Sequence, residues 1–97
     1  MPTQFRLDAY VVDTLMADLV RHDRQPSAFL VYLQLWLRAS RRRTAAVSHQ
    51  AMADATGLSK SAVQAAVRTL LRRRLIRAAR TSATAVPAYT VLRPWRR

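Results

Sequence analysis

The chain contains one glycine, Gly57, and it stands between two short segments built to the same pattern. Each segment has a hydrophobic residue, then a serine, and a second hydrophobic residue four positions after the serine. The two sets are Val47, Ser48 and Met52 before the glycine, and Leu58, Ser59 and Val63 after it. Serine is a favoured helix N-cap, and hydrophobic residues at these two positions often pack together across a helix start. Because glycine tolerates the positive φ of a tight turn, the pattern predicts two helices, 49–55 and 60–74, joined at Gly57.

The second of these helices has two distinct faces. Its apolar residues recur at helical spacing, which predicts that they face a core. They are Val63, Val67, Leu70 and Leu71. Its long polar residues recur every fourth position on another side: Lys60, Gln64, Arg68 and Arg72. This polar stripe is either an ordinary solvated helix face or a surface that contacts a ligand.

Two further helices are expected before this pair. Residues 8–21 form an amphipathic pattern with Asp8 as N-cap. Its predicted core stripe is Val12, Leu15, Met16 and Leu19. The next helix starts at Pro26 and Ser27 and runs through Leu37. Because it is apolar on almost every side, we expect it to be the buried central helix.

Short strands are expected in the second half of the chain. Residues 44–47 suit a linking strand, and residues 75–80 and 88–92 suit two strands of a hairpin. The intervening segment 81–87 is small, polar and free of glycine, which is more typical of a protruding wing than of a tight turn.

The predicted fold class is therefore mainly α with a small β-wing, about four helices plus a two- or three-stranded hairpin. With 97 residues the chain suits a single domain. Its expected parts are the N-terminal helices (1–43), the central helix pair (44–76), and the wing with a basic tail (75–97).

The charge of the chain points to a polyanionic partner. The chain contains seventeen Lys and Arg residues and five Asp, which gives a net charge of +12. Residues 1–23 sum to −2 and residues 24–97 to +14, so the basic surface belongs to the later part. Sixteen of the seventeen cations are arginine, whose planar fork matches phosphate and the guanine edge. Nucleic acid is favoured over a membrane surface because the apolar faces are needed for the core.

Several other classes are disfavoured. The chain has no Cys, and its two His and five Asp are dispersed, so we expect no catalytic group, no metal site and no cofactor. The first twenty residues contain aspartates and do not resemble a signal peptide, and the apolar stretch 28–37 is too short to span a bilayer. The expected location is cytoplasmic and nucleoid-associated.

Residues 48–64 resemble the helix-turn-helix of bacterial winged-helix transcription regulators, including those similar to the MarR group. The resemblance continues through Leu70, Leu71, Leu75 and Ile76, and it covers residues 47–92, about half the chain. The chain departs from the family at His49 and Gln50, where an acidic residue is common. It departs again at residues 72–74, three arginines where a glycine is frequent.

The resemblance implies a sequence-specific double-stranded DNA-binding protein, with helix 60–74 in the major groove. It implies that Ser59, Lys60, Ser61, Gln64 and Arg68 face the groove, and that Arg80 or Thr84 in the wing approaches the backbone or minor groove. The other candidate contacts are Ser48, His49, Gln50, Arg72, Arg41, Arg42 and Arg43. The chemistry of Gln and Arg suits such a role, because they pair bidentately with adenine and guanine. The run Arg41 to Arg43 is equally well explained as a solvated helix end.

Other functions stay open at this stage. A transcription regulator, with repression the expected mode, is favoured over a replication or partition accessory and over a protein-docking assembly module. A homodimer is expected through the N-terminal helix, where the apolar residues Phe5, Leu7, Tyr10 and Val11 exceed what one core face needs. RNA binding is less favoured because Trp36 lies in the most apolar helix. Trp95 could cover the core, contact a partner or lie beside phosphate.

Overall fold

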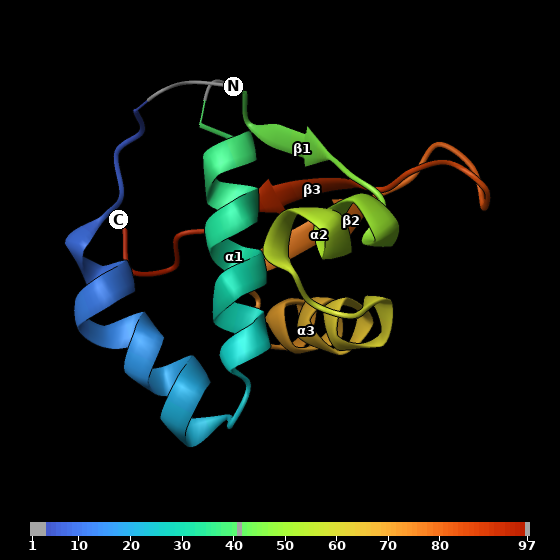
Figure 1. The fold of residues 1–97 in the computed structure, drawn as a ribbon. Helices are drawn as coiled ribbons and strands as arrows, with labels where there is room; N and C mark the ends of the chain where they lie inside the picture. Colours follow the sequence, from blue (N-terminus) through green and yellow to red (C-terminus); the bar gives the residue numbers. More distant parts are fainter. Residues whose placement is uncertain (1–3, 41, 97) are drawn as a thin grey trace.

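The computed structural model describes residues 4–40 and 42–96. Over these residues the chain forms four helices and a three-stranded antiparallel sheet (Figure 1). The N-terminal helix covers residues 9–22 and contains the segments η1 (Val11–Leu15) and η2 (Asp18–His22). The other elements are α1 (Pro26–Arg38), β1 (Thr44–Ala46), α2 (His49–Thr56), α3 (Lys60–Arg72), β2 (Ile76–Ala79) and β3 (Ala88–Val91). The predicted mainly helical fold with a small sheet is confirmed.

The sheet has the order β1-β3-β2, with β3 in the centre. Thr44 is opposite Thr90 in one ladder, and Ile76 is opposite Val91 in the other. The two predicted hairpin strands are confirmed to within one residue at each end, and the predicted linking strand pairs with β3. The loop between β2 and β3 therefore leaves the sheet at one end, while the loop between α1 and β1 lies at the other.

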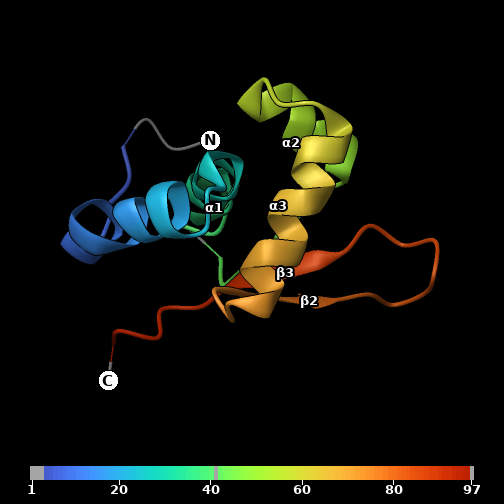
Figure 2. The same ribbon diagram turned by 90° about the horizontal axis from the view of Figure 1, so that it is seen from below.

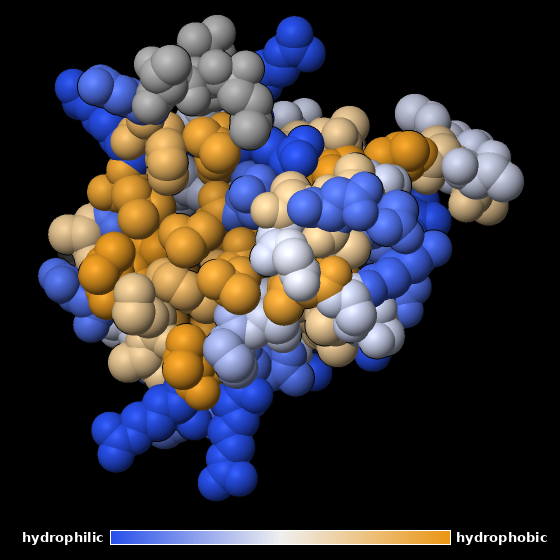
Figure 3. Space-filling view, in the orientation of Figure 1, coloured by the Kyte–Doolittle hydropathy of each residue, from blue (hydrophilic) through white to orange (hydrophobic). Residues whose placement is uncertain are grey.

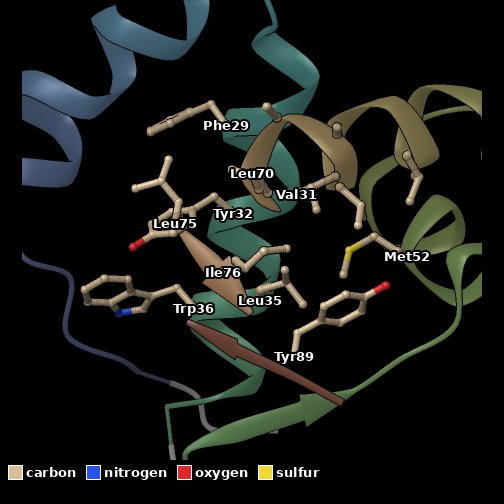
Figure 4. Packing of buried hydrophobic residues seen from close by; sticks show 14 of the residues in the cluster. Phe29, Val31, Tyr32, Leu35, Trp36, Met52, Leu70, Leu75, Ile76 and Tyr89 are labelled. Carbon is tan, nitrogen blue, oxygen red and sulfur yellow. The ribbon is translucent and has the colours of Figure 1, made fainter. Parts of the chain in front are cut away.

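The core lies between α1, α3 and the sheet (Figure 4). Val31, Tyr32 and Leu35 of α1 are fully buried there, as is Leu70 of α3. Burying an aliphatic side chain of this size stabilises a fold by ~1.5–3 kcal/mol. Tyr32 also donates its hydroxyl to the carbonyl of Leu92 at 2.8 Å, and burial raises the pKa of this phenol. The buried polar atom therefore has a partner, as a well-packed core requires.

The N-terminal helix exists as predicted, but its core stripe was predicted wrongly. The buried residues are Val11, Leu15 and Leu19, whereas Val12 is 50% exposed and Met16 is 38% exposed. The backbone explains the difference, because both η segments have π-helical i→i+5 hydrogen bonds. A π-helical turn contains more residues than an α-helical turn. In this helix, residues four positions apart therefore lie on the same side, and Val12 and Met16 lie away from the core.

α1 is central, as predicted, but it is not buried on all sides. Ala28, Phe29 and Trp36 are buried together with the residues named above. Leu30, in contrast, is 43% exposed, and the neighbouring turns place Leu33 and Leu37 at only partly buried positions. The expectation of a fully covered helix is therefore wrong for one side of α1.

The end of α3 adopts the left-handed turn that usually contains glycine. Arg74 has φ +56°, and the amide of Leu75 donates to the carbonyl of Leu70 at 2.9 Å. This i→i+5 bond next to a left-handed residue is a Schellman motif. The chain thus turns after α3 with an arginine in a conformation that glycine usually adopts.

The C-terminal segment packs back on the N-terminal helix. The Trp95 ring stacks on Tyr10 with centroids 4.6 Å apart and lies parallel to Trp36 at 6.4 Å. Its indole Nε1 donates to Asp8 Oδ2 at 2.8 Å, and Arg96 forms an ion pair with the same carboxylate. These bonds lower the pKa of Asp8, with the Arg96 hydrogen bond as the largest cause. Asp8 therefore binds the C-terminal segment, which corrects its predicted role as an N-cap, and Trp95 covers the core.

None of the helices in the described part of the chain combines the length and apolar character needed to cross a bilayer.

Candidate nucleic-acid interface

The turn between α2 and α3 is held by local hydrogen bonds. Ser48 Oγ accepts from the amide of Ala51 at 3.1 Å, and Ser59 Oγ accepts from the amide of Ala62 at the same distance. Both predicted N-caps are confirmed. Gly57 has φ +78°, and its amide donates to the α2 carbonyl of residue 53 at 2.9 Å. The lone glycine therefore fixes where α2 ends and how α3 leaves it.

α3 packs one side on the core and leaves the other side to solvent. Val63, Val67 and Leu70 are buried, as predicted. Leu71 was predicted in the same stripe and is 38% exposed. An α-helix turns by about 100° per residue, so Leu71, eight residues after Val63, points about 80° away from the direction of Val63. Ala66 fills the core position instead.

The outer side of α3 carries the predicted polar stripe. Lys60, Ser61, Arg68 and Arg72 are exposed, and Gln64 is half-buried between them. Within residues 4–40 and 42–96, none of the three cations in this stripe makes an ion pair with a carboxylate. A row of cations without internal partners is available to an external anion.

The wing extends away from the body of the molecule beside α2 and the start of α3 (Figures 1 and 2). The protruding loop predicted for residues 81–87 is confirmed, and Thr84 is exposed on it. At its base the amide of Val47 donates to the carbonyl of Pro87 at 3.3 Å, and Arg80 Nη1 donates to the carbonyl of Ala83 at 3.4 Å. The wing base is therefore attached to the segment that leads into α2.

His49, the first residue of α2, contacts β3. Its Nε2 lies 3.4 Å from the hydroxyl of Tyr89 on β3. Burial lowers the pKa of His49, and the positive charges of Arg80 and Lys60 lower it further. The wing base and the start of α3 are therefore both close enough to affect the protonation of His49.

Gln50 and the pair Arg42 and Arg43 belong to different parts of the fold. Gln50 Nε2 donates to Asp54 Oδ1 at 3.0 Å, so this side chain is hydrogen-bonded within α2.

Arg41 lies outside the described residues. Arg42 and Arg43 are exposed and line a cavity of about 420 Å³ together with Thr90 and Arg93. That cavity is at the end of β3 opposite the wing.

The structure thus divides the predicted contact residues into two groups. The α2–α3–wing group lies on or next to α2 and α3 and in the wing, and it consists of Ser48, His49, Gln50, Ser59, Lys60, Ser61, Gln64, Arg68, Arg72, Arg80 and Thr84. Arg42 and Arg43 form the second group with Arg93, whose guanidinium also covers the Trp36 ring at 4.3 Å. Sequence analysis missed Arg93, because only the pairing of β1 with β3 brings it near the arginine run.

In the part of the chain that the structure describes, no group of three His, Cys, Asp or Glu residues could hold a metal ion. Comparison with known proteins returned no matching family model, no matching curated protein and no matching solved structure.

Proposed function

We propose that the protein is a winged helix-turn-helix domain that binds double-stranded DNA without catalysing a reaction, with α3 in the major groove. The observation that supports this best is the outer side of α3, whose three cations have no internal ion pair in the described chain. An α-helix fits the major groove, which is about 12 Å wide. The wing lies next to the start of α3 and would contact the backbone or the minor groove.

Positions along α3 suggest different roles. Lys60 and Ser61 lie in its first turn, where free amides and the helix dipole attract phosphate. Gln64 and Arg68 lie one and two turns further on, in reach of base edges. Gln pairs with adenine and Arg with guanine, and each good pair gives about 1 to 3 kcal/mol of discrimination. This arrangement supports sequence-specific binding, and hence a transcription regulator acting at the nucleoid.

The electrostatic part of binding would come from several surfaces. A net charge of +12 favours any polyanion, so charge alone does not distinguish duplex DNA from RNA. Arg42 and Arg43 lie at the other end of β3 from the wing. They would reach only phosphates that flank the segment contacted by α3.

A selection experiment tests the proposal. Duplexes retained by the protein are selected from a random library, and binding of the best one is then measured at several salt concentrations. The proposal predicts an enriched sequence and a steep loss of affinity with salt. Enrichment of single strands or of RNA over duplex DNA would contradict it. Selection without any enriched sequence would leave a backbone binder that does not read bases.

A pair of variants assigns the binding to α3. Lys60→Ala and Arg68→Ala should each weaken binding to the selected duplex. Arg6→Ala removes the same charge from an exposed site in the N-terminal segment and should have little effect. Equal losses in all three variants would show that net charge, rather than α3, determines binding.

A further inference from the structure

The N-terminal helix and α1 share an apolar surface that nothing in the described chain covers. Five of the eight exposed large hydrophobic residues in the described chain lie on these two helices or just before the first one: Phe5, Val12, Met16, Val20 and Leu30. Figure 3 shows apolar side chains gathered over these two helices, on the side of the molecule away from the wing. A contiguous apolar patch of this kind is uncommon on a monomer and usually marks an interaction site.

The two sides of the N-terminal helix differ in their contacts. On one side, Tyr10 stacks on Trp95 and Asp18 lies 3.9 Å from Arg73. On the other side of the core stripe are Val12, Met16 and Val20, which recur every fourth residue and are all exposed. This second side has no partner among the described residues.

The same surface continues onto α1. Phe5 lines a mainly apolar groove of about 350 Å³ with Leu30, Leu33 and Leu37 of α1, and the groove reaches Ala55 at the end of α2. We call the whole surface the apolar face. Its members are Phe5, Val12, Met16, Val20, Leu30, Leu33 and Leu37.

The charges beside the apolar face suit a second copy of this chain. Asp13 and Arg21 are both exposed on the N-terminal helix and make no ion pair within the described residues. They lie four residues before and four residues after Ala17. Two such helices packed antiparallel around Ala17 place each Asp13 opposite the Arg21 of the other copy. A two-fold contact of this kind requires a surface that is complementary to itself.

The distribution of charge along the chain also favours a second copy as the partner. Residues 1–23 sum to −2, and the rest of the chain sums to +14. Two copies that meet through their N-terminal helices therefore join their least basic parts and keep their basic surfaces apart. An acidic protein partner would be drawn to the basic surfaces instead.

We propose that two copies of this chain form a dimer through the apolar face. The N-terminal helices lie antiparallel about a two-fold axis at Ala17, with Asp13 of one copy facing Arg21 of the other. This contact differs from the one expected from the sequence. Val11 and Leu7 pack on the core of the same chain, and Tyr10 is covered in part by Trp95. The N-terminal helix and the wing lie on opposite sides of the molecule (Figure 1), so a contact centred on Ala17 is away from the wing.

The first test measures the mass in solution without DNA, so that it is independent of the proposed DNA binding. Sedimentation equilibrium should give twice the chain mass of 11.0 kDa. Met16→Glu should give the single-chain mass, and its helical circular dichroism should be unchanged because this side chain is exposed. Leu71→Glu is the matched control, because Met16 and Leu71 are both 38% exposed. A monomeric wild-type protein overturns the dimer, as does a Met16→Glu variant that stays dimeric.

The second test addresses the antiparallel register. Asp13→Arg and Arg21→Asp each place two pairs of like charges at the interface and should raise the dimer dissociation constant about tenfold. The double variant restores both opposite-charge pairs and should return the constant to within a few-fold of wild type. Failure of the double variant to recover overturns the Asp13–Arg21 pairing. DNA binding by a purely monomeric protein would overturn the dimer and leave the proposed function intact.

Discussion

Arg73 Nη1 donates to Asp23 Oδ2 at 2.7 Å, although the two residues are fifty positions apart in the sequence. Arg73 is the residue directly after α3, and Asp23 directly follows the N-terminal helix. A second carboxylate, that of Asp18, lies 3.9 Å from the same guanidinium. The three consecutive arginines at the end of α3 consequently have different roles. Arg72 makes no ion pair with any residue of 4–40 or 42–96, Arg73 is paired, and Arg74 forms the turn.

Arg72 and Arg73 should therefore respond differently to the same substitution. Arg73→Ala should lower the free energy of unfolding by about 0.5 to 1 kcal/mol, because the lost pair is partly exposed. It should leave the salt dependence of DNA binding almost unchanged. Arg72→Ala should leave stability unchanged and reduce the log–log salt slope by about one, as expected for one lost phosphate contact. Urea unfolding and salt titrations check both, and an identical pattern in the two variants would contradict this assignment.

Gly57→Ala should destabilise the fold through the backbone alone. A Cβ at this position would meet no atom within 4 Å, so only the positive φ of +78° is unfavourable. A left-handed conformation costs a non-glycine residue about 1 to 2 kcal/mol. Chemical denaturation should show a loss of this size, and a smaller one for Gly57→Asn because asparagine tolerates this conformation better. An unchanged Gly57→Ala midpoint would mean that the turn has another geometry.

Arg74→Gly should have the opposite effect. Arg74 has a φ of +56°, so its backbone is in the left-handed conformation, which is unfavourable for arginine but not for the glycine at residue 57. Glycine removes this cost but gains more freedom in the unfolded chain, so the net stabilisation should be about 0.5 to 1 kcal/mol. The increase in thermal midpoint measures it. A decrease would show that the arginine side chain contributes a favourable contact larger than the backbone strain.

Gln64→Ala tests base reading separately from DNA affinity. If Gln64 pairs with an adenine, the variant should lose about 1 to 3 kcal/mol on the selected duplex and little on random DNA. Its sequence preference should relax at one or two neighbouring positions. A repeated selection with the variant measures this directly. The same enriched sequence as wild type would show that Gln64 does not read a base.

His49 makes both stability and binding depend on pH. Its folded pKa lies below the ordinary 6.5, so the unfolded chain takes up a proton first. The stabilisation is complete above about pH 6.5 and decreases as the pH falls through that value towards the lowered pKa. A nearby phosphate would favour the charged imidazole and raise this pKa on DNA binding. NMR titration of His49 with and without duplex checks the shift, using His49→Gln to assign the signal, and equal pKa values would exclude a phosphate near His49.

The parts that could be predicted from the sequence are those fixed by near neighbours. Ser48, Gly57 and Ser59 act through atoms three or four residues away, so their local pattern predicted the starts of both helices correctly and the end of α2 to within one residue. The end of α3 was predicted at residue 74, two residues later than in the structure. The strands β2 and β3 could likewise be predicted from the composition of residues 75–80 and 88–92. The polar stripe of α3 could be read from helical spacing because the helix is regular.

The parts that could not be predicted depend on distant contacts or on irregular backbone. The π-helical hydrogen bonds changed the period of the N-terminal helix, so a stripe calculated for an α-helix selected Val12 and Met16 wrongly. Arg73 looked like one more cation until the fold brought Asp23 to it. The neighbourhood of Arg93 likewise depends on strand pairing, which no local pattern specifies.

The attachment of the C-terminal segment to Asp8 also affects how the chain can fold during synthesis. The two side chains that bind this carboxylate follow it by 87 and 88 positions. A ribosome must therefore release the chain as far as Arg96 before Asp8 acquires these two neighbours. Contacts this distant in sequence form slowly, because a long loop has to close first. Until then, the apolar side chains of the N-terminal helix stay accessible to chaperones and to other nascent chains.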